Sequence, residues 1–264
     1  MSSKTSIEWT NATWNPTTGC RKVSPGCDHC YAATLAKRLK AMGNRRYQND
    51  GPDGPGFGLT LHHDKITEPL SWRAPRLVFV NSMSDLFHAQ VPDDFIDAVW
   101  STMAVARQHQ FQVLTKRPRR MAQVVERLAR KYGVLQNVWL GTSIELDHYT
   151  WRADWLRETP AKIRFLSLEP LLGPLPSLEL DGIHWVIVGG ESGPKHRPVE
   201  PTWVRLIREL CIGNGVAFFL KQWGGRTPKA GGRELDGRTW NEMPALESSS
   251  RKRLLVDQGL TGGL

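Results

Sequence analysis

Short apolar runs alternate with amphipathic stretches along most of this chain. The runs fit buried strands, because they are almost continuously apolar instead of alternating between apolar and polar positions. They cover residues 76–81, 111–115, 137–142, 163–167, 185–189 and 216–220. Helical patterns fill most of the gaps, at residues 93–108, 118–132, 148–158 and 201–212. This alternation predicts an α/β protein with a parallel sheet that is covered on both faces.

The first part of the chain adds one further unit. Residues 7–18 are expected to form an extended lead-in strand, and the spacing of Leu35 and Leu39 predicts a helix that begins near Tyr31. The chain then offers six to seven β/α units, enough for a partial or complete (β/α) barrel of parallel strands. A doubly wound open sheet is the competing arrangement. The proline-rich link 170–182 is not expected to be helical.

The alternation reaches residue 224 without an obvious boundary, so residues 1–224 are expected to form one barrel domain. Within it, residues 43–64 form a long irregular stretch rich in glycine and proline. A lid over a site and a loose insertion are alternative interpretations of this stretch. Residues 225–264 have many glycines and few apolar positions, which predicts a C-terminal extension or hairpin.

Composition and charge narrow the class of protein. With 40% hydrophobic and 23% charged residues, the 264-residue chain is typical of a soluble protein. No run approaches the ~18 apolar residues of a membrane span, and the first residues lack the apolar core of a signal peptide. The low cysteine count favours a reducing compartment, so we expect a cytoplasmic protein with no membrane partner.

The chain is basic, with 35 Lys and Arg against 26 Asp and Glu and a net charge of +9. Such a charge favours polyanions, and some of the eleven tryptophans could stack on bases. General solubility explains the charge nearly as well. A nucleic-acid partner is therefore favoured by composition but not established by it.

Three of the four cysteines lie in one short segment, residues 19–31, which we call the cysteine loop. Six residues separate Cys20 from Cys27, and two separate Cys27 from Cys30, so a turn at Pro25-Gly26 can fold the first thiol back onto the others. Three thiols are an odd number for disulfides but suit a metal site. They leave one coordination position of a tetrahedral metal or a cubane cluster open.

Two kinds of metal site fit these donors. Zinc would take the three thiolates with His29 or a distant residue, but structural zinc sites usually contain a second Cys-x-x-Cys pair, and this sequence has none. Cys211 lies in an apolar helical pattern and is expected to pack in the core. Because no fourth ligand is evident, an iron–sulfur cluster with one open iron is favoured over zinc.

Polar residues follow every predicted strand. The carboxyl ends of parallel strands meet at one edge of the sheet, where ligands bind. Charged groups are more frequent there than turns or helix caps require, which indicates a site. No P-loop or dinucleotide fingerprint occurs. The candidate positions are Ser82, Ser84, Asp85, Ser143, Glu145, Glu169, Glu191 and Lys221.

The segment Cys27-Asp28-His29-Cys30-Tyr31, after a first strand and ahead of six β/α units, resembles the radical S-adenosylmethionine (radical SAM) superfamily. More narrowly, a phage-associated three-cysteine-motif branch of that superfamily is similar over residues 14–20, 24–32, 167–170, 189–193 and 219–224. The resemblance covers about residues 7–224. The spacing departs from it, because most of the superfamily has three residues between the first two cysteines, and this chain has six.

The resemblance implies a 4Fe–4S cluster bound by Cys20, Cys27 and Cys30, with S-adenosyl-L-methionine (SAM) on the open iron. An electron from an external donor would cleave SAM to a 5′-deoxyadenosyl radical, which takes a hydrogen atom from the substrate. The residues implied in holding the adenine, methionine and ribose of SAM are Tyr31, Ser82, Ser84, Asp85, Ser143 and Glu145. The residues implied in substrate contact or proton transfer are Lys221, Glu169 and Glu191.

The resembled branch contains enzymes encoded beside phage DNA-hypermodification genes. We therefore expect an isomerase that rearranges an amino-acid-modified thymine, a hypermodified pyrimidine, in DNA or in a nucleotide. If a phage encodes it, the enzyme would act in the host cytoplasm. A radical SAM DNA photoproduct lyase is the alternative enzyme. A zinc-stabilised nucleic-acid-binding module without catalysis is the alternative from another class.

Overall fold

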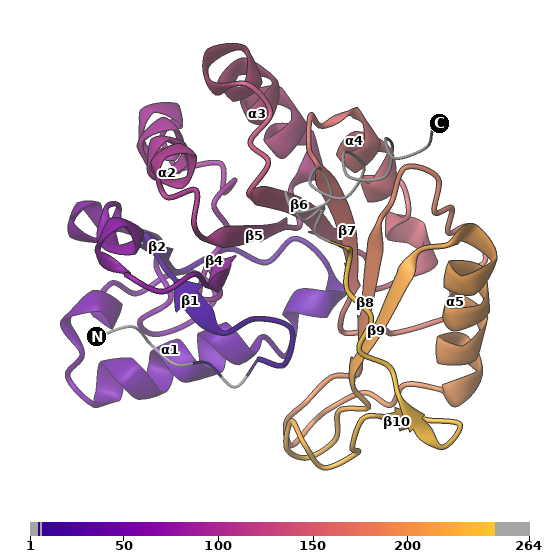
Figure 1. The fold of residues 1–264 in the computed structure, drawn as a ribbon. Helices are drawn as coiled ribbons and strands as arrows, with labels where there is room; N and C mark the ends of the chain where they lie inside the picture. The colour runs from indigo at the N-terminus through magenta and orange to yellow at the C-terminus, as the bar shows by residue number, and fades with distance from the viewer. Residues whose placement is uncertain (1–4, 6, 246–264) are drawn as a thin grey trace, which may run out of the picture.

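A seven-stranded parallel sheet is the main feature of the computed structural model, which describes residue 5 and residues 7–245 (Figure 1). Each strand pairs with the next one in the sheet in parallel register. The six strands predicted between residues 76 and 220 are confirmed, with ends that differ by at most two residues, whereas the lead-in predicted over residues 7–18 forms only the shorter β1 and the two-residue strand Thr17–Thr18. The strands are β1 (Ala12–Trp14), β4 (Leu77–Val80), β5 (Gln110–Thr115), β6 (Val138–Ser143), β7 (Ile163–Leu168), β8 (Trp185–Gly189) and β9 (Ala217–Gln222).

Helices occupy the positions predicted between the strands. They are α1 (Tyr31–Ala41), α2 (Asp93–Val105), α3 (Pro118–Tyr132), α4 (Arg152–Glu158) and α5 (Pro201–Asn214). Helix α4 is shorter than predicted, because a separate 3-10 turn forms at Asp147–Tyr149. Residues 170–182 contain no helix, as predicted. Every helix among the described residues is too short or too polar to cross a membrane.

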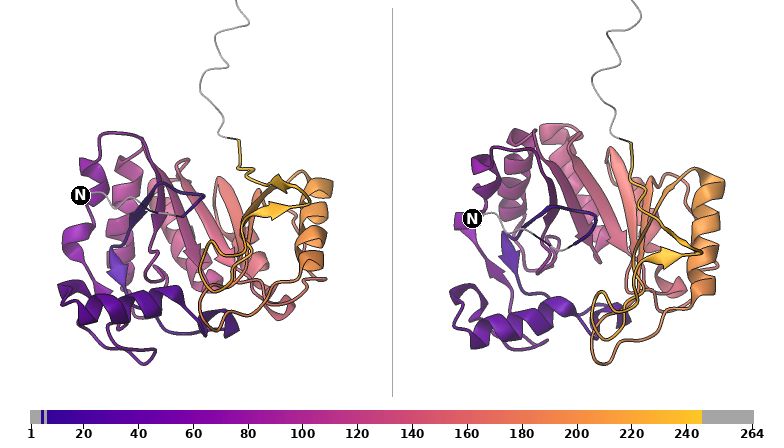
Figure 2. Two further views of the ribbon diagram at one scale, coloured as in Figure 1. Left: turned by 90° about the horizontal axis from the view of Figure 1, so that it is seen from below. Right: turned by 60° about the horizontal axis from the view of Figure 1, so that its bottom comes forward.

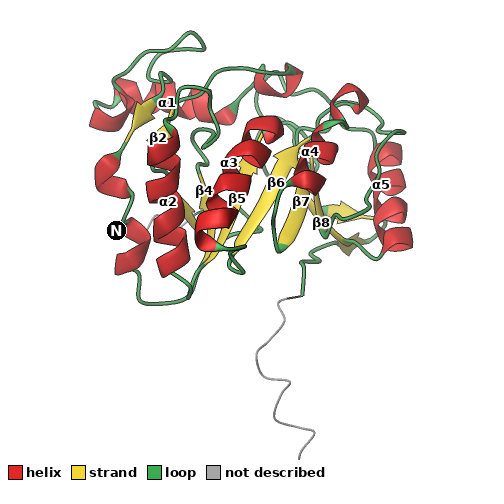
Figure 3. Cartoon of the chain, turned by 90° about the horizontal axis from the view of Figure 1, so that it is seen from above, coloured by secondary structure: helices red, strands yellow, loops and turns green. Residues whose placement is uncertain are grey.

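The strands lie side by side in chain order, which decides between the predicted architectures. Right-handed crossovers between the strands from β4 onward put their connecting helices on the same face. Figure 3 shows α2, α3 and α4 in front of the sheet and α5 at its side, and Figure 1 shows all four outside its arch. The first and last strands do not pair with each other, so the sheet is a partial barrel. Both a closed barrel and a doubly wound sheet are excluded.

Apolar residues fill both faces of the sheet, but helices cover only the convex face, which corrects the expectation of a helix-covered sheet on both sides. The concave face has its own core of large side chains, with Trp185 fully buried at its centre. The Trp185 ring makes edge contacts with Trp9, Trp139 and Phe219 at centroid distances of 6.0, 5.9 and 6.0 Å. Several of the tryptophans therefore stabilise the barrel interior.

Residues 43–64 pack beside the cysteine loop and are not a loose insertion. They contain the 3-10 turn Arg45–Tyr47 and strand β3 (Thr60–Leu61), which pairs with β2 (Thr17–Thr18). The backbone N–H of Cys20 donates to the carbonyl of Phe57 at 3.3 Å. This segment therefore supports the loop that carries the thiols.

The predicted C-terminal hairpin is present as β10 (Glu234–Leu235) and β11 (Arg238–Thr239). The chain then runs along the outer edge of β9, where the carbonyl of Trp240 accepts from the N–H of Leu220 at 3.0 Å. The indole of Trp185 donates to the carbonyl of Glu242 at 2.8 Å. The first part of the predicted extension thus packs on the barrel, and residues 246–264 lie outside the described residues.

Candidate functional site at the carboxyl ends of the strands

The cysteine loop lies across the carboxyl edge of the sheet and touches the ends of several strands (Figure 2). At the end of β4, the N–H of Gly19 donates to the carbonyl of Met83 at 3.0 Å. The hydroxyl of Tyr31 donates to the carbonyl of Ser82 at 2.5 Å. Cys30 is the N-cap residue of helix α1, which begins at Tyr31 as predicted. The end of the cysteine loop is therefore fixed by the start of this helix.

Arg117 joins the loop to the end of β5. Its Nη1 lies 3.5 Å from the Sγ of Cys20 and 2.8 Å from Oδ2 of Asp85. Its Nη2 donates to the carbonyl of Arg21 at 2.8 Å. A single guanidinium can make these contacts because it presents several donors in a fixed plane. Arg117 therefore brings positive charge directly to the first thiol.

Glu145, two residues after β6, lies beneath the turn of the loop. A Cβ atom added to Gly26 would lie 3.0 Å from the Glu145 carboxyl carbon, so glycine permits the close approach. The carboxylate accepts from Lys116 at 3.3 Å and from Arg152 at 2.9 Å. Burial alone would raise the pKa of Glu145, but these two cations hold it below its ordinary value. Its Oε1 is buried without a hydrogen-bond partner among the described residues.

Glu191, two residues after β8, fastens the opposite side of the loop. Its carboxylate lies 2.8 Å from Nδ1 of His29 and 2.5 Å from Nη2 of Arg197. Arg197 also donates to the carbonyl of Pro25 at 2.9 Å. Despite burial, which opposes charge, hydrogen bonds from Arg197 and His29 lower the pKa of Glu191 to about 2. The carboxylate is therefore ionised at neutral pH and cannot serve as a proton donor there.

The ends of β7 and β9 contribute an ion pair. The Nζ of Lys221 lies 2.5 Å from Oε1 of Glu169, and both side chains are partly buried. A Cβ atom on Gly189 would lie 3.1 Å from the carboxyl carbon of Glu169. Gly189 thus makes room for the carboxylate of Glu169, and Gly190 makes room for the carbonyl of Trp223, which would lie 2.0 Å from an added Cβ atom.

Three more of the six predicted SAM contacts are, like Tyr31 and Glu145, already bonded within the protein. Ser82 Oγ lies 3.2 Å from the Asn15 side chain, and Ser84 Oγ donates to the carbonyl of Thr17 at 2.8 Å. Buried Asp85 accepts from the Thr115 hydroxyl, the Arg117 guanidinium and two backbone N–H groups. This carboxylate orders the ends of β4 and β5. Ser143, the last of the six, is a buried residue at the end of β6.

The three thiols lie at one end of the barrel, within a small apolar cluster or beside charged groups. Cys20 and Cys30 pack against buried residues that include Tyr47, Phe57 and Met83. Burial, reinforced by Asp85 and opposed by Arg117, raises the pKa of Cys20 to about 12. Burial also raises the pKa of Cys30. Deprotonating such thiols needs a cationic partner, and a metal centre provides one.

The donor set fits an iron–sulfur cluster. Among the described residues, no three His, Cys, Asp or Glu side chains are arranged around the position of a single metal ion. In a 4Fe–4S cluster each thiolate binds a different iron, so the thiols need not converge on one point. Cys211 is fully buried in α5, away from the loop, which confirms its assignment to the core. Three thiols are therefore available to a cluster at this edge.

Four positively charged residues of the site were not among the sequence candidates. Lys116 and Arg117 directly follow β5, so the rule that ligands bind at carboxyl ends of strands could have found them. Arg152 and Arg197 had no such signal. Arg152 lies on a helix, and Arg197 lies in a loop and reaches a carbonyl 172 residues earlier in the chain.

The fold and the site together define a class of protein: a parallel partial barrel with a three-cysteine loop across the carboxyl edge of its sheet. A family model described as "Protein of unknown function (DUF5131)" matches residues 4–244, and the chain belongs to that family. No curated protein matches the sequence.

Among solved structures, spore photoproduct lyase complexed with dinucleoside spore photoproduct is similar, with a TM-score of 0.43 and 10% identity. A mutant of that lyase with bound AdoMet and dinucleoside spore photoproduct gives a TM-score of 0.45 and 10% identity. Each match covers 80% of this chain and 63% of the lyase. At this level of similarity, the sheet topology described above establishes the fold, and the comparison carries no argument about the reaction.

Proposed function

We propose that this protein is a radical SAM enzyme in which Cys20, Cys27 and Cys30 hold a 4Fe–4S cluster. The observation that carries the proposal is the position of the cysteine loop, which the ends of β4, β5, β6 and β8 hold over the partial barrel. When bound, the cluster and SAM supply a 5′-deoxyadenosyl radical, using one electron from an external donor. The protein supplies binding, orientation and exclusion of water.

Residues at the rim have distinct proposed roles. The ring of Tyr31 is exposed while its hydroxyl is fixed, so it presents a rigid aromatic face to an adenine. The unpartnered Oε1 of Glu145 can accept from a ribose hydroxyl without losing the ion pairs that its Oε2 makes. Ser82 and the backbone beside it are proposed to hold the methionine part of SAM. Ser84, Asp85 and Ser143 are proposed to position these groups.

The ion pair of Lys221 and Glu169 is proposed to contact the substrate. Both groups come from strand ends beside the loop, and each can exchange its present partner for a polar group of the substrate. Glu191 differs, because its carboxylate is already bonded to His29 and Arg197. We assign it the role of holding the cysteine loop.

The proposed substrate is an amino-acid-modified thymine in phage DNA, which the enzyme rearranges as an isomerase. The likeness of the cysteine loop and of the segments at the carboxyl ends of β7, β8 and β9 to the phage-associated branch supports this choice. An isomerase leaves the atom count of its substrate unchanged, whereas a photoproduct lyase would break a bond between two thymines. Liquid chromatography with mass spectrometry of nucleosides from treated DNA separates the two reactions. A product of unchanged mass but new retention time supports isomerisation, and release of two thymidines would support lyase chemistry instead.

The cluster is tested by anaerobic reconstitution of the full chain. We expect a brown protein with about four irons and four sulfides, which releases 5′-deoxyadenosine when SAM and dithionite are added. Cys27→Ala should lose both the colour and the release, because it removes one of three ligands. Cys211→Ala is the matched control and should keep both, since Cys211 lies in the core. A colourless protein with one zinc, or equal losses in the two variants, would contradict the proposal.

A further inference from the structure

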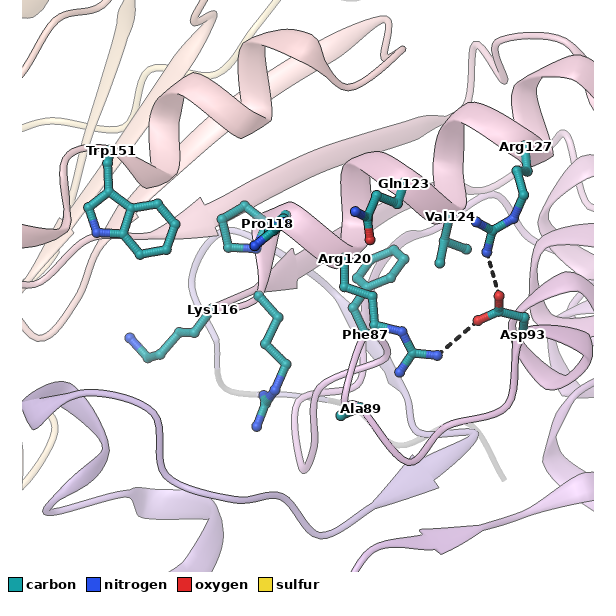
Figure 4. A pocket seen from close by; sticks show the side chains of 12 residues that line it. Phe87, Ala89, Asp93, Lys116, Pro118, Arg120, Gln123, Val124, Arg127 and Trp151 are labelled. Atoms are coloured by element: carbon teal, nitrogen blue, oxygen red, sulfur yellow. Dashed lines mark hydrogen bonds and ion pairs between the residues drawn. The ribbon is translucent and has the colours of Figure 1, made fainter.

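A basic groove lies beside the site and shares Lys116 and Arg117 with it. It has a volume of about 540 Å³ and is formed by the start of α3, the loop after β4 and Trp151. Figure 4 shows Lys116 and Trp151 at one end of the groove and Arg127 at the other. Five cations line it, and the one carboxylate is Asp93. The cations are Lys116, Arg117, Arg119, Arg120 and Arg127.

The position of these cations works against the stability of helix α3. The amino end of a helix carries partial positive charge and is normally flanked by acidic residues. Helix α2 follows this rule, with Asp93 and Asp94 in its first turn. Helix α3 has no acidic residue in its first turn and no side-chain cap, and Arg119 and Arg120 lie there instead. Positive charge concentrated at the positive end of a helix attracts anions.

The exposed side chains form a line along α3. Arg119, Gln123 and Arg127 are four residues apart and so share one face of the helix. Arg119 forms no ion pair with any described residue, and its guanidinium lies 5.7 Å from the ring of Trp155. Arg119 and Arg127 are separated by about 12 Å along the axis, which is more than a single phosphate group spans.

The groove runs from the candidate site at one end to Arg120 and Arg127 at the other, so a bound polyanion would extend away from the site. At one end, Lys116 reaches Glu145 and thus the candidate site. Trp151, 45% exposed, stands at the same end and offers a face to a base. At the other end, Arg127 and Arg120 share Asp93.

We propose that this groove binds the sugar–phosphate backbone of single-stranded DNA next to the nucleotide that enters the site. The proposal deepens the proposed function and rests on it for the identity of the substrate. It also chooses between polymer and free nucleotide, because the line of cations extends away from the site. Arg119 and Arg127 contact phosphates, and Trp151 stacks on a base.

The test measures binding of a fluorescent 12-nucleotide oligothymidylate by anisotropy, on the full chain as purified, over a series of salt concentrations. Arg119→Ala and Arg127→Ala should each weaken binding by about five- to tenfold at low salt and lower the salt slope by about 1. Arg107→Ala is the control, because Arg107 is an exposed cation at the amino-terminal edge of the sheet. It should change the affinity less than about twofold.

A variant with higher affinity for the oligonucleotide provides a test that misfolding cannot mimic, because a misfolded protein would lose binding. Asp93→Asn removes the one carboxylate of the groove and should strengthen binding by about two- to fivefold. Asp94→Asn makes the same charge change in the same turn of α2, but Asp94 does not line the groove, so a smaller effect is expected. Trp151→Ala should weaken binding, and Trp151→Phe should restore most of it.

Thymidine 5′-monophosphate distinguishes the polymer from the nucleotide. At millimolar concentration it should not displace the oligonucleotide. Displacement that depends on Arg119 would overturn the proposal in favour of a nucleotide subsite, and equal effects of Arg107→Ala and Arg119→Ala would overturn it altogether. The assay needs neither SAM nor a reductant. Failure of the radical chemistry would leave its result unchanged, and failure of the groove would leave the iron content unchanged.

Discussion

At the scale of single residues, some charged side chains of the site hold the backbone of the cysteine loop in place, and others are free to contact a ligand. The sequence marked Glu191 as a carboxylate after a strand and therefore as a candidate for proton transfer. In the structure it is bonded to His29 and Arg197, and its low pKa keeps it ionised. Glu145 is different, since one of its oxygens has no partner among the described residues. Two carboxylates that follow strands in the same way thus differ in whether an oxygen is free to accept a further hydrogen bond.

Glu191→Gln tests the holding role. The change removes the charge that pairs with Arg197 and should lower the free energy of unfolding by about 2 kcal/mol at pH 7. It should also reduce the iron retained after reconstitution, because the loop is less firmly held. Glu200→Gln, on an exposed side chain at the start of α5, should change neither quantity. Normal iron content in Glu191→Gln would show that the loop does not depend on this ion pair.

The stabilisation by Glu191 should depend on pH in a defined direction. Its pKa in the folded state, about 2, lies below the ordinary value of 4.5. The contribution of its charge is therefore complete above about pH 4.5 and is lost as the pH falls toward 2. Urea unfolding of the apoprotein at pH 7, 4 and 2.5 should show the difference between wild type and Glu191→Gln shrinking with acidity. A difference that grows toward low pH would contradict this assignment.

At the scale of elements, the cysteine loop and residues 43–64 are built against one another. Gly19 has a φ of +81°, and a Cβ atom there would lie 2.2 Å from the carbonyl oxygen of Gly58. Such an approach is possible only without a side chain. The N–H of Lys22 donates to Asp53 at 2.9 Å, which adds a second tie between the two segments. The long irregular stretch is therefore a support for the thiol-bearing loop.

Gly19→Ala should separate these two segments. The variant combines backbone strain with a backbone clash, and we expect a loss of about 3 kcal/mol in the free energy of unfolding. Gly43→Ala is the matched control, because Gly43 has a φ of +74° but open space around its Cβ position. It should cost only about 1 kcal/mol, from strain alone. Equal costs measured by urea unfolding would mean that the contact with Gly58 is not tight.

The regular elements could be predicted from the sequence, and the reason is local. A buried parallel strand such as β8 must be apolar at every position, so Trp185–Gly189 was located without error. The cysteine loop could be found because three thiols fall within a few residues. The tie from Arg197 to Pro25 could not be found, since it joins residues that only the curvature of the sheet brings together. The support from residues 43–64 was equally hidden, because irregular backbone has no periodicity.

At the scale of the whole molecule, an open sheet must protect its edge strands. Beside β9 this is done by residues 240–242, which follow the hairpin of β10 and β11. Trp240 is 7% exposed, and its ring packs on Phe218 at 5.6 Å. The guanidinium carbon of Arg238 lies 3.7 Å from the centroid of the Trp240 ring. The start of the predicted extension is therefore part of the barrel.

Trp240→Ala should expose this edge. We expect a loss of about 3 kcal/mol in the free energy of unfolding, with aggregation at lower temperature, because β9 would be left uncovered. Trp151→Ala serves as the comparison, since Trp151 is 45% exposed and its loss should cost less than about 0.5 kcal/mol. The two variants should also separate in DNA binding, which only Trp151→Ala impairs. Similar melting temperatures for the two proteins would contradict this account of the edge.

The bonds from Glu191 and Arg197 to the cysteine loop have a consequence for biosynthesis. They join positions that are 162 and 172 residues apart, so the ribosome makes the thiols long before it makes the groups that hold them. During synthesis from the amino end, an early segment cannot form contacts with residues that have not yet been made. For most of translation, the cysteine loop of the nascent chain consequently lacks its contacts with Glu191 and Arg197. If Cys20, Cys27 and Cys30 hold the proposed cluster, its binding loop is fully supported only after the last strands have joined the sheet.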